Sequence, residues 1–178
     1  MSDAVVKGPK LVDTAYHEAG HAVAAWWFGQ LKKRDYVTII PDPQTGSLGH
    51  LRNPPRFTSE MGNSSREKSG RVTLQAEKFV IGCLAGNAAS CQHRKTKRRH
   101  LAGGQIDRQQ AVEILIRLVG TGEELRTYFH LLQIRAENLV ARFWPEVEAV
   151  ANRLLSEKTL TSEQIRETCL SARGKPSS

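Results

Sequence analysis

Asp13-Thr14-Ala15-Tyr16-His17-Glu18-Ala19-Gly20-His21-Ala22-Val23-Ala24-Ala25-Trp26-Trp27-Phe28-Gly29 is the stretch that decides the fold, because it predicts a capped helix with a chemical motif in its centre. Its alanines favour helix formation. Asp13 or Thr14 is a suitable N-cap, and Gly29 is suited to the position that follows a helix C-cap. His17, His21, Ala24 and Phe28 fall on one stripe, so the two histidines are expected on a buried or cleft-facing side.

Residues 17–21 have the pattern H-E-x-x-H. Positions i and i+4 of a helix share a face, so His17 and His21 can bind the same metal ion. Glu18 lies about 100° further round the helix, where it can reach a water on that metal without being a ligand. The pattern predicts one Zn²⁺ per chain, with Glu18 as the catalytic general base. Two core histidines and a surface glutamate are the alternative.

A catalytic zinc site needs a third protein ligand. Ala24 and Trp27 occupy the positions of the glycine and third histidine in H-E-x-x-H-x-x-G-x-x-H, and no downstream glutamate begins E-x-x-x-D. Asp107 is the better candidate, because it follows Gly103-Gly104 at a predicted helix start, in phase with that helix's apolar stripe. A buried carboxylate needs a partner, which a metal would supply. A helix-dipole role for Asp107 is the alternative, and the rival ligands are His50, His93, His100 and His130.

The rest of the chain predicts one mainly α domain over residues 1–178, with a small β element beside the metal helix and a C-terminal helical bundle. A β-branched run at 36–40 indicates a strand, and a short hairpin is expected through 48–51. Residues 1–12 are expected to be an N-terminal extension, 52–70 a flexible loop or lid, and 171–178 a frayed tail. Further helices are expected at 71–90, 103–119, 123–143 and 145–155, and after a capping box formed by Thr161 and Gln164.

Composition limits the partners and the location. The formal net charge is +8, and residues 93–100 form a basic run. Nucleic-acid binding by this run stays an alternative, weakened because no aromatic residue is interleaved to stack on a base. Three cysteines without a C-x-x-C pair indicate free thiols and a cytoplasmic location; Cys83 and Cys91 are expected to be core thiols, with metal ligation as the alternative. No membrane segment is expected, since no stretch approaches the roughly 20 apolar residues that a crossing requires.

Five further observations concern segments that follow one another along the chain: Ala15-Tyr16-His17-Glu18-Ala19-Gly20-His21-Ala22-Val23; Val37-Thr38-Ile39-Ile40-Pro41 with Gly46-Ser47-Leu48-Gly49; Leu84-Ala85-Gly86-Asn87-Ala88-Ala89; Gly103-Gly104-Gln105-Ile106-Asp107; and Leu155-Ser156-Glu157-Lys158-Thr159-Leu160-Thr161. Together these five segments resemble the zinc peptidase domain of the FtsH family. The resemblance implies a helical, zincin-like peptidase fold with Asp107 as third zinc ligand. It also implies that 36–40 presents a strand edge to an extended peptide, and that the substrate-binding residues are Val37, Thr38, Ile39, Ile40 and Gly49.

The chain departs from this family in two respects. It has no G-x-x-x-x-G-K-[ST] motif and no room for an ATPase module, and Asn87, Ser90 and Cys91 stand where the family has an arginine and two acidic residues. We expect a stand-alone, ATP-independent zinc metalloendopeptidase that hydrolyses unfolded or extended polypeptides. The alternative is a catalytically impaired metal-binding adaptor or regulatory module of the same fold. A separate ATPase partner and a homo-oligomer are left open.

Overall fold

The computed structural model describes residues 9–41, 50–52, 70–96 and 104–173. This part of the chain forms six helices and three short strands, which confirms the mainly α class. In chain order they are α1 (Pro9–Trp27), β1 (Tyr36–Thr38), β2 (His50–Arg52), α2 (Gly70–His93), α3 (Gln105–Val119), α4 (Glu123–Arg142), α5 (Trp144–Glu157), β3 (Thr159–Thr161) and α6 (Ser162–Arg173).

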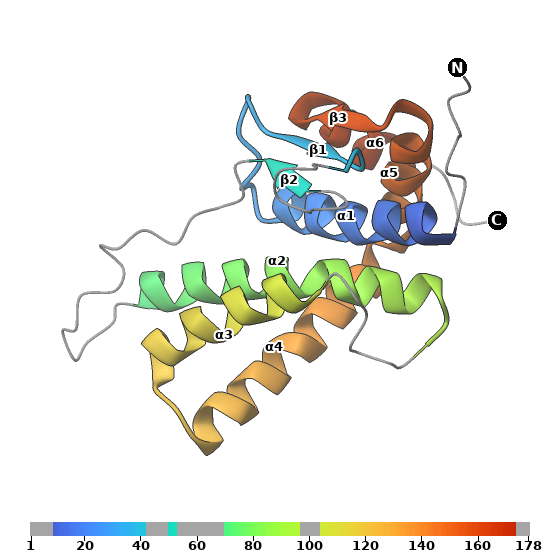
Figure 1. The fold of residues 1–178 in the computed structure, drawn as a ribbon. Coiled ribbons are helices and arrows are strands. Elements are labelled where there is room, and N and C mark those ends of the chain that lie inside the picture. The colour runs from blue at the N-terminus through green and yellow to red at the C-terminus, as the bar shows by residue number, and fades with distance from the viewer. Residues whose placement is uncertain (1–8, 42–49, 53–69, 97–103, 174–178) are drawn as a thin grey trace.

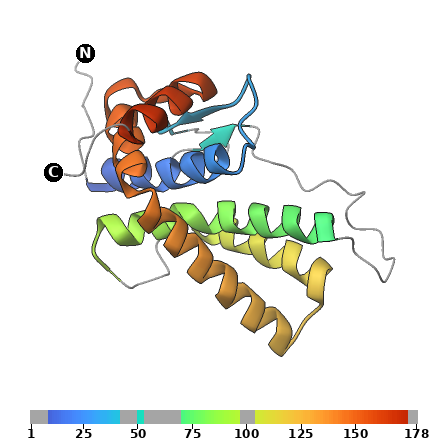
Figure 2. The same ribbon diagram turned by 180° about the vertical axis from the view of Figure 1, so that it is seen from behind.

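Helix α1 lies at the centre of the molecule, between two groups of elements (Figure 1). The sheet, α5 and α6 lie on one side of it, and α2 lies along the other with α3 and α4 packed against α2, as the reverse view in Figure 2 also shows. Small side chains make this central position possible, since they let neighbouring helices approach closely. Ala15, Ala19, Ala22 and Val23 are completely buried. The two motif histidines are therefore carried by the most enclosed helix of the fold.

The beginning of α1 differs from the prediction. The helix begins at Pro9, so an N-cap at Asp13 or Thr14 is wrong, and residues 9–12 are helix rather than extension. Proline suits a first helical turn, where its missing N–H has no intrahelical partner to lose. Leu11 and Val12 add packing against the core. The Asp13 carboxylate accepts a hydrogen bond from Arg94 Nε at 2.6 Å instead of capping the helix.

The end of α1 is as predicted. Gly29 has a φ of +67°, the left-handed conformation that favours glycine. The N–H of Gly29 donates to the Trp26 carbonyl at 3.0 Å, and the N–H of Gln30 donates to the Ala25 carbonyl at 2.8 Å. This pair of bonds is the Schellman motif, which satisfies carbonyls that the helix itself leaves unpaired.

The strands form one antiparallel sheet with the order β2-β1-β3. In β1, Tyr36 pairs with Arg52 on one side and with Thr161 on the other. The predicted strand is thus confirmed for Tyr36–Thr38, but the expectation that it presents a free edge is wrong. The reason is β3, a strand in the α5–α6 connection that local sequence patterns do not indicate. Its pairing is continued by Ile39, whose N–H donates to the Lys158 carbonyl at 2.9 Å.

The other predicted boundaries agree with the structure to within a few residues. The capping box is confirmed: the Thr161 N–H donates to Gln164 Oε1 at 2.8 Å and the Gln164 N–H donates to Thr161 Oγ1 at 3.3 Å. The tail prediction is wrong for residues 171–173, which are the last residues of α6. Several predictions fall outside the described residues: the hairpin before His50, the loop over 53–69, His100 and the last five residues.

All three cysteines of the chain, Cys83, Cys91 and Cys169, are free thiols in the structure. None of the helices in the described part of the chain combines the length and the apolar character that a membrane crossing requires.

Candidate metal centre

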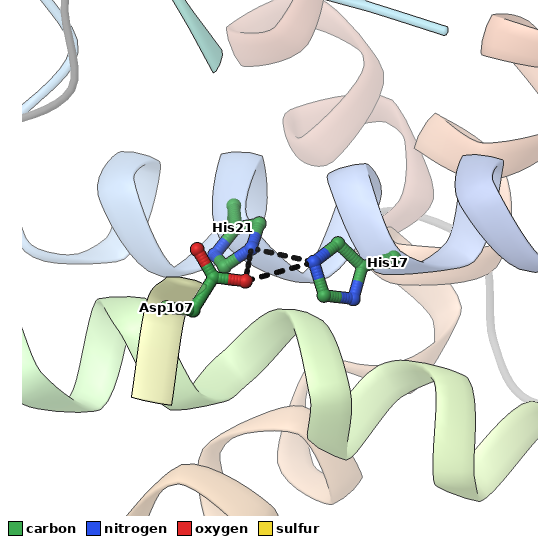
Figure 3. A group of neighbouring side chains, drawn as sticks. All are labelled: His17, His21 and Asp107. Atoms are coloured by element: carbon green, nitrogen blue, oxygen red, sulfur yellow. Dashed lines mark hydrogen bonds and ion pairs between the residues drawn. The ribbon is translucent and has the colours of Figure 1, made fainter. Parts of the chain in front are cut away.

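His17, His21 and Asp107 meet at one point between α1 and α3 (Figure 3). His17 Nε2 lies 3.1 Å from Asp107 Oδ2 and 3.1 Å from His21 Nε2. The third side of this triangle, from His21 Nε2 to Asp107 Oδ2, is 3.4 Å. Two nitrogens and one oxygen therefore face one another at nearly equal distances.

The two histidines come together because they lie one turn apart on α1, whereas Asp107 comes from 90 positions further along the chain than His17. Helix α3 brings it there by packing along α2, which in turn packs along α1. Asp107 is in the first turn of α3 and in phase with Ala111 and Leu115, which are completely buried. The stripe that packs α3 onto the core therefore also directs the carboxylate toward the histidines.

A backbone carbonyl fixes the proton arrangement of His21. Nδ1 of His21 lies 2.8 Å from the carbonyl oxygen of Gly82 on α2. A carbonyl oxygen only accepts hydrogen bonds, so Nδ1 must be the donor. In a neutral imidazole the other nitrogen then holds a lone pair. The Nε2 lone pair of His21 is therefore directed at His17 and Asp107, as in histidines that bind metals.

The three facing atoms need positive charge between them. With both imidazoles neutral, His21 Nε2 and Asp107 Oδ2 are both acceptors, and His17 Nε2–H is the single donor available to the pair. Burial opposes a charge on His21, but the Asp107 carboxylate outweighs it and, with Glu18 and the Gly82 carbonyl, raises the pKa of His21 to about 9. Burial likewise opposes a charge on Asp107, yet the two histidines hold the pKa of its carboxyl well below the usual range. The site is built to attract either a proton or a cation.

The geometry and the donor types fit a metal ion. Two ligands about 2.0–2.1 Å from zinc, at a tetrahedral angle, lie about 3.3 Å apart. The observed separations of 3.1, 3.1 and 3.4 Å are close to that value. The side chains are not fully buried, with 16% of His17 and 24% of Asp107 exposed. His17, His21 and Asp107 could hold a metal ion, and three protein ligands leave a fourth position for water.

Glu18 is next to His17 on α1 and is 5% exposed. Its negative charge is close enough to His21 to contribute to the raised pKa of that imidazole. Glu18 is therefore a buried acid beside the candidate ligands rather than a surface residue. Its role as a general base stays a prediction.

The rival ligands whose side chains the structure describes lie elsewhere or have other partners. His93, at the end of α2, stacks on Tyr16 with ring centroids 3.7 Å apart. His130 is exposed on α4, and the side chain of His50 lies outside the described residues. Burial, and then the negative charge of Asp107, raises the pKa of the Cys83 thiol, so Cys83 stays protonated in the core.

Of the predicted substrate-binding residues that the structure describes, three are buried and one is exposed. Val37, Thr38 and Ile39 are buried, and the Thr38 hydroxyl lies 2.8 Å from the hydroxyl of Thr159 in β3. Ile40 is 54% exposed and follows the strand. Gly49 lies outside the described residues.

Sequence reasoning missed Gly82, because a main-chain acceptor leaves no side-chain signature. One signal is nevertheless available. Gly82 and Gly86 lie one turn apart inside α2, where each glycine destabilises a helix by about 1 kcal/mol relative to alanine. Only Gly86 marks a close approach: a Cβ there would lie 2.4 Å from His21 Nε2, whereas a Cβ on Gly82 would meet nothing within 4 Å.

Comparison with protein-family models gives no match to this chain, and comparison with curated proteins gives none either. The candidate metal centre is therefore the feature from which function has to be inferred.

Proposed function

We propose that this protein is a zinc-dependent metallopeptidase that hydrolyses peptide bonds in unfolded or extended polypeptides. The observation that carries the proposal is the convergence of two imidazole nitrogens and one carboxylate oxygen, with a buried glutamate directly after the first histidine. The resemblance of five ordered segments to the FtsH peptidase domain supports it.

His17 and His21 would hold Zn²⁺ through Nε2, and Asp107 would hold it through Oδ2. When bound, zinc supplies a Lewis acid that polarises the substrate carbonyl and lowers the pKa of water toward about 7. The Glu18 carboxylate accepts a proton from the attacking water and passes it to the nitrogen of the leaving amine. The Gly82 carbonyl keeps the His21 proton on Nδ1, so the Nε2 lone pair stays available.

Substrate would bind along the sheet, but not on β1, which has a neighbour on each side. Among the described strands, β2 and β3 are the outer ones, and β2 contacts α1 whereas β3 contacts α5 and α6. We therefore place strand pairing with an extended polypeptide on β2, which lies against the helix that carries the catalytic motif. The substrates are peptides, disordered segments, or chains delivered by a separate ATPase.

The deciding experiment replaces Glu18 by glutamine, which keeps the shape of the side chain and removes the base. Glu18→Gln should retain zinc, measured by elemental analysis, and lose about 10²- to 10⁴-fold in cleavage of quenched peptides and unfolded casein. Glu124→Gln, on the exposed first turn of α4, is the matched control and should cleave as wild type does. Wild-type activity in Glu18→Gln would refute the mechanism.

The same experiment addresses the alternative, a catalytically impaired adaptor. Its motivation is the α2 segment in which Asn87 replaces a family arginine, next to the Gly104 position that precedes α3. Wild-type protein that binds zinc, yet turns over no unfolded substrate between about pH 6 and pH 9, would favour the adaptor.

A further inference from the structure

The backbone of α2 at Gly86 lies so close to the imidazole of His21 that a side chain at this position would collide with the ring. A Cβ placed on Gly86 would lie 2.4 Å from Nε2, 2.7 Å from Cε1 and 2.8 Å from Cδ2 of His21. These are the three nearest heavy atoms, and real Cβ atoms essentially never come within 3.0 Å of another heavy atom. The His21 ring therefore lies directly on the α2 backbone at Gly86.

Two backbone positions of α2 contact the His21 ring and set its orientation. The Gly82 carbonyl accepts the hydrogen bond from Nδ1, and Gly86, one turn further along the same face, contacts the ring at Nε2. Rotating the ring away from a new atom at Gly86 would break the hydrogen bond from Nδ1 to the Gly82 carbonyl.

We propose that Gly86 is a positioning residue of the metal centre, required because only glycine leaves room for the imidazole of His21 in its metal-binding orientation. The proposal rests on the metal site of the proposed function. A methyl group at Gly86 would have to displace the ring by at least 0.6 Å, the difference between 2.4 Å and 3.0 Å. Metal–ligand distances tolerate only about 0.2 Å, so the displaced ring would bind zinc poorly.

The first test compares metal binding by wild type, Gly86→Ala and Gly70→Ala. Gly70 is exposed at the start of the same helix, and a Cβ there meets nothing within 4 Å, so it controls for the glycine-to-alanine change itself. Gly86→Ala should lose about 10- to 100-fold in zinc affinity, measured against a competing chelator. It should also lose the visible absorption of tetrahedral Co²⁺, which Gly70→Ala should keep. Undiminished zinc affinity in Gly86→Ala would overturn the proposal.

A second test needs no bound metal, so it can be used even if Gly86→Ala is too unstable to bind zinc. The variants are combined with His21→Ala, which removes the ring, and melting temperatures are measured with a chelator present. Gly86→Ala should lower the melting temperature of wild type but not of His21→Ala, because the methyl then has space. Gly20→Ala is the contrast: its Cβ would meet the Ala85 carbonyl oxygen at 2.4 Å, so its cost should be the same in both backgrounds.

Equal losses for Gly86→Ala in the two backgrounds would show that the methyl collides with something other than His21, and would overturn the proposal. Failure of the proposed function and failure of the Gly86 role give different results. If wild type binds no zinc, the proposed function fails, but the melting temperatures still show whether a methyl group at Gly86 collides with the His21 imidazole. If wild type binds zinc and cleaves peptides but Gly86→Ala binds zinc equally well, only the positioning role fails.

Discussion

The metal-free protein should lose stability as pH rises from about 6.5 to about 9, because His21 titrates in that range. The folded-state pKa of His21, about 9, is above its ordinary value of 6.5, so folding favours the charged imidazole. Its contribution to the free energy of unfolding is therefore complete below about pH 6.5 and is lost as pH rises through about 9. Since a tenfold change in proton affinity is worth about 1.4 kcal/mol, the full contribution is about 3 kcal/mol, falling to about 2 kcal/mol at pH 7.5 and below about 1 kcal/mol at pH 9.

Urea unfolding in excess chelator, from about pH 5.5 to about pH 9, measures this contribution for wild type and for Asp107→Asn. Asparagine keeps the shape of the side chain and removes the carboxylate, which is the largest influence raising the pKa of His21. The difference between the two proteins should be largest at low pH and should shrink toward pH 9. Glu163→Gln, which changes an exposed side chain of α6, should follow wild type throughout. Parallel curves for wild type and Asp107→Asn would refute the electrostatic account of the site.

Three further predictions concern two ion pairs and a helix cap, each measured by urea unfolding of zinc-loaded protein. Arg94→Ala, which removes an exposed partner of Asp13, should cost less than about 1 kcal/mol, and a larger loss would mean that this pair does more than a surface ion pair. Arg173→Ala leaves the buried Glu146 carboxylate without its guanidinium at 3.2 Å and should cost about 2 kcal/mol or more; a loss equal to that of Arg94→Ala would show that the carboxylate does not depend on this guanidinium. Thr161→Ala removes one half of the capping box at the start of α6 and should cost about 1 kcal/mol, whereas no change would show that the box is dispensable.

Local patterns predicted the features that depend on near neighbours. The end of α1 at Gly29 and the capping box before α6 involve residues three to five positions apart, so the sequence contains all of their partners. Asp107 is predicted as a ligand because it lies on the same face of α3 as the buried apolar residues Ala111 and Leu115, and this face packs toward the core. Helical phase therefore carried information about the site as well as about the fold.

The features that local patterns missed depend on distant partners. Helix α1 begins four residues before the predicted cap because Leu11 and Val12 pack on the core and Asp13 bonds to Arg94, 81 positions away. Strand β3 pairs with β1 across about 120 positions, and nothing in its own three residues indicates that pairing. The contact of Gly82 with His21 spans 61 positions and uses a main-chain oxygen. Each of these is set by tertiary packing.

A metal ion held by His17 and Asp107 would join two residues that lie 90 positions apart in the chain. An ion that binds only the folded chain stabilises it by about 4 kcal/mol when its free concentration is about 1,000 times its dissociation constant. Metal-free molecules would then unfold more often than metal-bound ones. An unfolded molecule is a substrate of the kind that we propose the zinc-bound protein cleaves. We therefore expect the protein to clear its own unmetallated copies. Zinc-loaded wild type should degrade metal-stripped Glu18→Gln faster than metal-loaded Glu18→Gln, and equal rates would exclude such clearance.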